Sequence, residues 1–93
     1  MLKISIADSD KERRLILEGK LIAPWTTEVQ RVCHEARQSL RGREIGLDLK
    51  NLTVISQEGE NLLAARMKEG IKVRGCCVFA REVLRKLRAR ARG

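Results

Sequence analysis

The stretch Ile45–Leu63, IGLDLKNLTVISQEGENLL, decides the fold that we predict for this chain. Residues 45–49 alternate between apolar side chains and polar or small ones, which is typical of a strand with one buried face. Residues 50–53 predict a polar turn with one apolar anchor, and residues 54–55 form a second short apolar pair. The stretch therefore begins as the central strand of a sheet.

A helix is predicted to follow this strand directly. Ser56 has the side chain of an N-cap, because its hydroxyl can accept a hydrogen bond from a free N–H group of the first turn. Glu58 and Glu60 place negative charge near the positive end of the helix, where it stabilises. We expect the helix to span residues 57–68 and to stop at Gly70. A short junction between a strand and a helix N-terminus often holds a binding or modification site.

Strand patterns also lie before and after this stretch. Residues 2–7 and 15–22 predict two strands of a hairpin, joined by a turn at residues 8–11, and residues 71–74 predict a short final strand. Each strand has one apolar face. We expect a solvated face that carries Lys3, Ser5, Glu18, Lys20, Lys72 and Arg74.

Two further helices are predicted from apolar residues that recur every three or four positions. The first has Pro24 in its first turn, an apolar stripe over residues 25–40, and its end at Gly42. The last begins near Val78, and we expect its buried stripe to be Phe79, Val83 and Leu87.

The element order is therefore β-β-α-β-α-β-α, which places the chain in the α/β class. Strands that alternate with helices of this length predict parallel β-α-β units with right-handed crossovers. Because every strand has one apolar and one mostly polar face, we expect a mixed sheet with its helices mainly on one face. A chain of 93 residues predicts a single domain, 1–93, with a basic helix or tail over residues 81–93.

Composition narrows the compartment and the chemistry. No apolar run approaches the ~20 residues of a membrane span, and the N-terminus lacks an apolar signal core. Three cysteines, Cys33, Cys76 and Cys77, argue against a disulfide framework and for a reducing compartment, so we expect a cytoplasmic protein. Their spacing to the single histidine, His34, fits no zinc pattern, and geometry places His34 in solvent. We find no catalytic constellation and predict no enzyme activity, metal or cofactor.

The net charge of +8 is concentrated at the C-terminus. Residues 81–93 hold six lysines or arginines against one glutamate, and four of them form a stripe: Arg81, Arg85, Arg88 and Arg92. Such a stripe can be a solvated helix face, or it can meet an acidic partner, nucleic acid or an anionic membrane surface. Both aromatic side chains lie on predicted core stripes, which leaves no platform for base stacking.

The central stretch resembles the signature of the STAS domain, shared by sulphate transporters and anti-sigma-factor antagonists. The resemblance rests on Leu47-Asp48-Leu49, Leu52-Thr53-Val54-Ile55, Gly59 and Leu62-Leu63, and it extends from about Leu15 to Leu87. The family has Asp-Ser-x-Gly where this chain has residues 56–59, Ser-Gln-Glu-Gly. The phosphorylated serine of the family thus corresponds to Gln57, which has no hydroxyl.

The resemblance implies a regulatory module that binds a protein, in the manner of an anti-sigma-factor antagonist and its kinase. The surface that it implies comprises Ser56, Gln57, Glu58, Gly59 and Asn61, with Asp48 either as an acidic neighbour or as the cap of the predicted turn. Two alternatives stay open: the STAS subunit of a membrane transporter, and a nucleic-acid-associated protein that uses the arginine stripe. Homodimer formation is also left open.

Overall fold

The computed structural model describes residues 1–75 and 77–92, except for the side chains of residues 91 and 92. Its elements follow the predicted order β-β-α-β-α-β-α. They are β1 (Leu2–Asp8), β2 (Glu12–Leu21), α1 (Trp25–Arg37), β3 (Glu44–Ile55), α2 (Gln57–Lys68), β4 (Lys72–Arg74) and α3 (Val78–Arg92).

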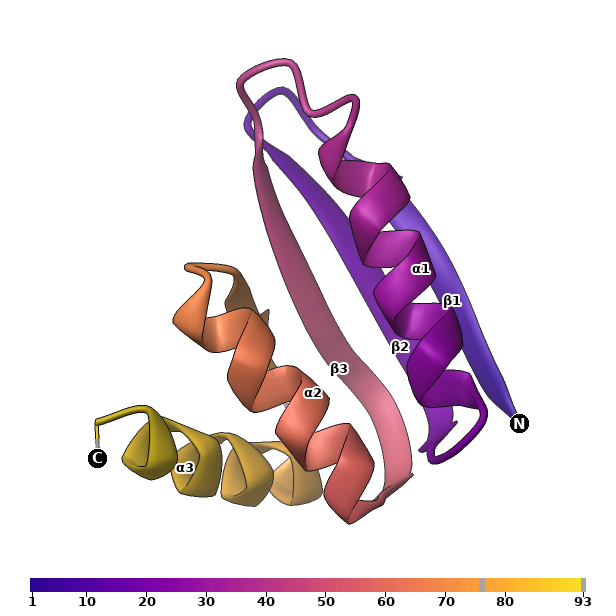
Figure 1. Cartoon of the computed structure of the whole chain (residues 1–93), viewed down its shortest axis with the longest axis vertical. Coiled ribbons are helices and arrows are strands. Elements are labelled where there is room, and N and C mark those ends of the chain that lie inside the picture. Colours follow the sequence, from indigo (N-terminus) through magenta and orange to yellow (C-terminus); the bar gives the residue numbers. More distant parts are fainter. Residues whose placement is uncertain (76, 93) are drawn as a thin grey trace.

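The strands form a mixed sheet in the order β1-β2-β3-β4. Figure 1 shows β1, β2 and β3 side by side in this order. β1 and β2 make the predicted antiparallel hairpin, in which Leu2 lies opposite Gly19 and Asp8 opposite Arg13. β3 runs parallel to β2, and β4 runs parallel to β3. Each parallel pair is connected through a helix, as the alternation of strands and helices predicted. The α/β class and the mixed sheet are confirmed.

The predicted turn at residues 50–53 is wrong, because β3 continues without a break to Ile55. Ile16 lies opposite Asp48 and Glu18 opposite Asn51, so β3 uses three residue steps where β2 uses two. A second extra residue follows between Leu52 and Val54. Such bulges bend a strand and increase its twist, and β3 curves along its length in Figure 1. In residues 50–53, Asn51 and Leu52 therefore pair with β2, whereas Lys50 and Thr53 have no register partner and lie at the two irregularities.

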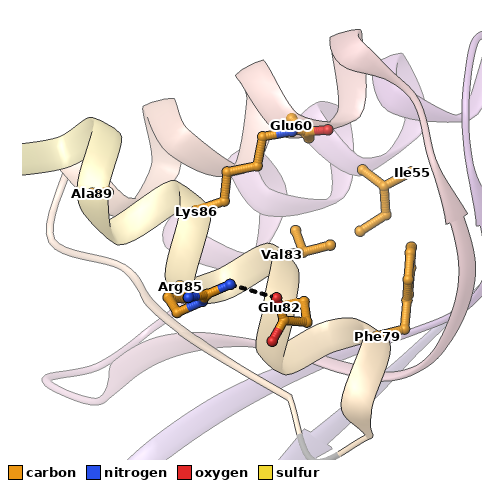
Figure 2. A pocket seen from close by; sticks show the side chains of 8 residues that line it. All are labelled: Ile55, Glu60, Phe79, Glu82, Val83, Arg85, Lys86 and Ala89. Atoms are coloured by element: carbon orange, nitrogen blue, oxygen red, sulfur yellow. Dashed lines mark hydrogen bonds and ion pairs between the residues drawn. The ribbon is translucent and has the colours of Figure 1, made fainter.

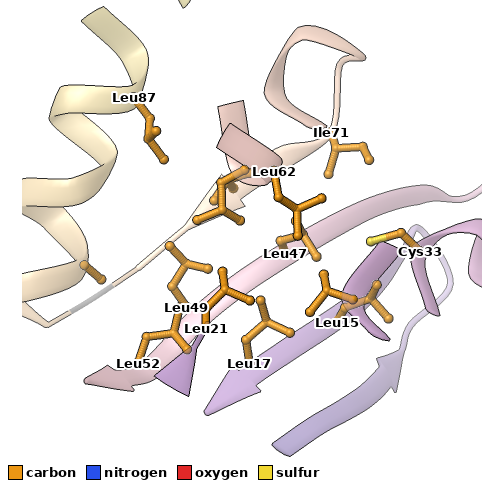
Figure 3. Close-up of a cluster of buried hydrophobic side chains, with 14 of the residues drawn as sticks. Leu15, Leu17, Leu21, Cys33, Leu47, Leu49, Leu52, Leu62, Ile71 and Leu87 are labelled. Atoms are coloured by element: carbon orange, nitrogen blue, oxygen red, sulfur yellow. The ribbon is translucent and has the colours of Figure 1, made fainter. Parts of the chain in front are cut away.

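The apolar core lies between one face of the sheet and the helices (Figure 3). Leucines from β2 and β3 form its floor, and the least exposed of them are Leu15, Leu17, Leu21, Leu47 and Leu49. α1 and α2 cover this floor, with α3 against α2 and the end of the sheet (Figure 1). Cys33 of α1 lies within this core, and burial raises the pKa of its thiol.

The opposite face of the sheet is polar, as the alternation predicted. Four of the residues expected there are exposed and two, Ser5 and Glu18, are half-buried. Ion pairs cross this face: Arg74 binds Glu12 of β2 at 2.6 Å, and Arg14 lies 3.9 Å from Asp48 of β3. The helices thus cover one face, and charged side chains that neutralise one another cover much of the other.

The ends of α1 differ from the prediction. Pro24 is the N-cap and not the first helical residue, and the helix ends at Arg37, well before Gly42. Arg13 of β2 accounts for the early end, because its Nη1 donates to the carbonyl of Ala36 at 3.2 Å and to Oγ of Ser39 at 2.8 Å. The same guanidinium donates to Asp8 at 2.8 Å, and this hydrogen bond holds the pKa of Asp8 below its usual range.

Candidate functional site

The junction between β3 and α2 is tied to the end of β2 by Ser56. The predicted N-cap is confirmed, since the Ser56 hydroxyl accepts a hydrogen bond from the Gly59 N–H at 3.1 Å. The same hydroxyl donates to the carbonyl of Leu21 at 3.3 Å, and the Ser56 N–H reaches that carbonyl at 3.0 Å. Both hydrogen-bonding functions of the hydroxyl are therefore engaged inside the protein.

Gly59 allows α2 to approach β2 closely. A Cβ atom at this position would lie 2.7 Å from the carbonyl oxygen of Leu21 and 3.0 Å from a methyl group of Ile55. Because the first of these neighbours is backbone, it cannot move aside as a flexible side chain could. The glycine that contributes to the STAS resemblance is thus a packing requirement in this chain.

The three remaining residues of the predicted surface, Gln57, Glu58 and Asn61, are exposed on the first turns of α2. Gln57 donates from Nε2 to Oδ1 of Asn61 at 3.1 Å, which orders both amides one helical turn apart. The structure therefore brings together the five predicted residues 56–59 and 61, with two that hold the junction and three that face solvent. We call these five residues the junction surface.

Asp48 lies apart from the junction surface. It is an interior residue of β3, eight positions before Ser56, which corresponds to roughly 25 Å along a strand. Its carboxylate points to the polar face, where it lies 3.9 Å from Nη1 of Arg14. The predictions that Asp48 neighbours the site or caps a turn are therefore wrong. Its ion-pair partner in the described structure is Arg14 of the neighbouring strand, β2.

The buried face of α3 is not the predicted one. Ala80, Leu84 and Leu87 are buried, whereas Val83 is half-buried and Phe79 keeps 40% of its surface exposed. Of the predicted stripe only Leu87 is correct. The reason lies before the helix, where a Cβ on Gly75 would come within 2.4 Å of the Ala80 Cβ. Only small residues fit at this contact, and it turns Ala80 inward and Phe79 outward.

Phe79 and Val83 consequently line an open groove of about 530 Å³ between α3 and the start of α2. Figure 2 shows both side chains and Ile55, from the end of β3, directed toward this space. Charged residues form its rim: Lys86 lies 3.2 Å from Glu60 of α2, and Arg85 lies 2.7 Å from Glu82. We call this feature the α2–α3 groove. Sequence periodicity did not find it, because residues 79, 83 and 87 fit a helical stripe as well as residues 80, 84 and 87 do.

Three members of the predicted arginine stripe, Arg81, Arg85 and Arg88, are exposed on α3. Arg92 belongs to the helix, but its side chain lies outside the described residues. Within the described part of the chain, neither Arg81 nor Arg88 has a carboxylate within 4 Å, so their charge is presented to solvent. The prediction of a basic stripe holds for the side chains that can be placed.

Among residues 1–75 and 77–92, no three His, Cys, Asp or Glu side chains lie close enough together to hold a metal ion. His34 is exposed, as expected, and its Nε2 lies 3.2 Å from Gln38. Cys77 is half-buried and its sulfur accepts from the Ala80 N–H at 3.4 Å, whereas Cys76 lies outside the described residues. No described helix is long and apolar enough to cross a membrane.

Comparison with known proteins bears on the fold. Neither a protein-family model nor a curated protein matches the chain. Among solved structures, the chain resembles an uncharacterized protein of the DUF3478 family from Shewanella loihica PV-4, which is described as having a SpoIIAA-like fold. The TM-score is 0.55 at 15% sequence identity, over 84% of this chain and 70% of that one. This chain has a SpoIIAA-like, STAS-like fold. At such low identity the likeness extends to the fold alone.

Proposed function

We propose that this chain is a non-catalytic interaction module of the STAS type, similar to anti-sigma-factor antagonists, that binds a protein partner without a serine phospho-switch. The observation that carries the proposal is the state of the junction surface. The position of the family's phosphorylated serine holds Gln57, and the hydroxyl of the preceding residue, Ser56, is engaged by Gly59 and Leu21.

Phosphorylation of Ser56 would disrupt the junction. Its oxygen would lose the proton that it donates to the Leu21 carbonyl, and about two negative charges would be added beside Glu58 and Glu60. The side chain is also half-buried, which hinders access by a kinase. We therefore expect partner binding to be constitutive, or to be controlled from outside residues 56–59.

The exposed members of the junction surface suit a polar protein contact. Gln57, Glu58 and Asn61 offer donors and acceptors on the first turns of a rigid helix. The STAS subunit of a membrane transporter would use a protein contact as well. The identity of proteins that copurify with the chain, an anti-sigma kinase or a transporter ATPase, distinguishes these two settings.

The phospho-switch is tested by incubating the protein with ATP and an anti-sigma-type kinase, followed by intact mass measurement. We expect no added phosphate on the wild type, and phosphate on the double variant Ser56→Asp/Gln57→Ser, which restores the family's motif. Phosphate on the wild type that disappears in Ser56→Ala would show that the switch survives one residue earlier, and would overturn this part of the proposal.

Partner binding is tested separately with the same kinase. We expect Gln57→Lys/Asn61→Lys to weaken binding at least about 10-fold, since it replaces two neutral amides by two positive charges and removes their acceptors without touching the core. Lys3→Glu/Lys20→Glu, on the polar face of the sheet, serves as the matched control and should bind normally. Equal loss in both variants would contradict a contact at the junction surface.

A further inference from the structure

The α2–α3 groove is the place where the described chain exposes apolar side chains beside a basic helix. Phe79, the only phenylalanine of the chain, is 40% exposed there, and its neighbour Val78 is 78% exposed. Val83 and Ile55 complete an apolar floor (Figure 2). A volume of about 530 Å³ lies within the range of sites that receive several side chains of a ligand.

The side of α3 that faces the groove changes character along the helix. Phe79 and Val83, one turn apart, are apolar, and Arg85 and Lys86 in the next turn are basic, so these lining residues form one stripe along the helix. A ligand that lies along this stripe, about 10 Å long, would meet an apolar half and then a cationic half.

The charged side chains that line the groove are Arg85 and Lys86, with Glu60 and Glu82. Over residues 78–90 as a whole, α3 carries five basic side chains and a single acidic one, so the helix that borders the groove is basic. Arg85 binds Glu82, but both side chains are more than 60% exposed, so this pair is weak and gives way readily. Across the groove, Glu60 is only 14% exposed beneath Lys86, so little negative charge reaches solvent there.

We propose that the α2–α3 groove docks an acidic amphipathic helix of a partner protein. Apolar residues of that helix fill the space among Ile55, Phe79 and Val83, and its carboxylates lie over Arg85 and Lys86. This inference rests on the proposed function in one respect, namely that the chain works by binding proteins. It adds the chemistry of the partner and a second contact beside the junction surface.

The same charges decide against the other occupants. A second copy of this chain would bring two strongly basic α3 helices together, which costs free energy by like-charge repulsion. A nucleic acid would use the apolar floor only by stacking its bases on aromatic side chains, and Phe79 is the only aromatic side chain there. An acidic amphipathic helix uses both halves of the stripe.

The probe for the test is a fluorescein-labelled peptide of about 16 residues. It carries leucines at i, i+3, i+4 and i+7 followed by glutamates, and fluorescence anisotropy measures its binding to the intact chain. We expect Phe79→Ser to weaken binding about 10-fold and Arg85→Glu/Lys86→Glu to weaken it at least as much. A peptide with lysines in place of the glutamates should not bind measurably.

The matched control is Arg81→Glu/Arg88→Glu, which changes the net charge of α3 by the same amount away from the groove. Arg88 lies toward β4, where it lines a separate depression with Lys72 and Arg74. We expect this variant to bind the peptide normally. Equal weakening by both charge reversals would show non-specific attraction and would overturn the proposal. Circular dichroism and thermal melts confirm that each variant is folded.

Other occupants give distinct results. The chain can also be tested against vesicles of phosphatidylcholine with phosphatidylserine, and against duplex DNA. If either of these binds in a way that requires Phe79, and the acidic peptide does not bind, the proposal is overturned. A dimer in sedimentation that Phe79→Ser dissociates would also overturn it. If the kinase still binds Phe79→Ser but not Gln57→Lys/Asn61→Lys, the proposed function stands and the groove proposal fails. If the peptide binds and the kinase does not, the groove proposal stands and the proposed function fails.

Discussion

The junction surface and the α2–α3 groove are neighbours, joined through Ile55 and Glu60, but they meet solvent in opposite ways. At the junction, the hydroxyl of Ser56 and the backbone of Gly59 are held by interactions inside the protein. At the groove, Phe79 exposes apolar surface that the core leaves uncovered. In this chain the residues that resemble the STAS motif hold the start of α2 against β2. The exposed apolar surface lies on the adjacent helix, α3.

The largest effect should come from truncating the buried side of α3. Leu84→Ala is expected to lower the free energy of unfolding by about 3 kcal/mol, because Leu84 is 3% exposed and its loss leaves a cavity. Phe79→Ala should cost only about 1 kcal/mol, since much of its ring is already in water. Urea denaturation measures both, and equal losses would mean that the two sides of α3 do not differ in this way.

The next effect tests the close approach at the junction. Gly59→Ala should lower the free energy of unfolding by about 2 kcal/mol, because the new methyl group would overlap the Leu21 carbonyl. Asn61→Ala, two residues further along the exposed side of α2, is the control and should change stability by less than about 0.5 kcal/mol. If Gly59→Ala is as stable as the wild type, the close approach of α2 to β2 does not require a glycine at this position.

Removal of the cap should have a smaller effect. Ser56→Ala is expected to cost about 1 kcal/mol, because the Gly59 N–H loses its acceptor at the N-terminus of α2. Ser56→Thr keeps a hydroxyl and should recover most of the loss. Thermal unfolding followed by circular dichroism checks both variants, and a neutral Ser56→Ala would show that solvent caps the helix as well as the side chain does.

The smallest effect is expected on the solvent side of α3. Arg81→Ala/Arg88→Ala should leave the free energy of unfolding within about 0.5 kcal/mol of wild type, because neither guanidinium has a described carboxylate partner. A loss of more than about 2 kcal/mol would mean that the arginine stripe packs on the body of the protein. The stripe would then be structural and could not serve as the neutral control for the groove.

Local patterns were sufficient wherever the deciding interactions are close in sequence. The N-cap at Ser56 is recognisable because its partner, Gly59, lies three residues away. The bounds of α2 follow from the cap and from Gly70, and the alternation in β2 and the first half of β3 identifies the face that is buried. In β1 the same alternation holds only at its start, since Leu2 is buried but Ile6 is 54% exposed. The order of the elements and the mixed sheet were predicted from these local patterns as well.

Distant contacts decided the rest. Residues 50–53 have turn-like side chains, yet β2 supplies hydrogen-bonding partners that hold them in a strand. The end of α1 depends on Arg13, which reaches Ala36 across 23 positions of sequence. Two stripes of α3 satisfied the helical period equally, and the contact between Gly75 and Ala80 selected one of them. Periodicity predicts that a helix has a buried side, but only packing against neighbouring elements selects that side, and here the selection left Phe79 in the groove.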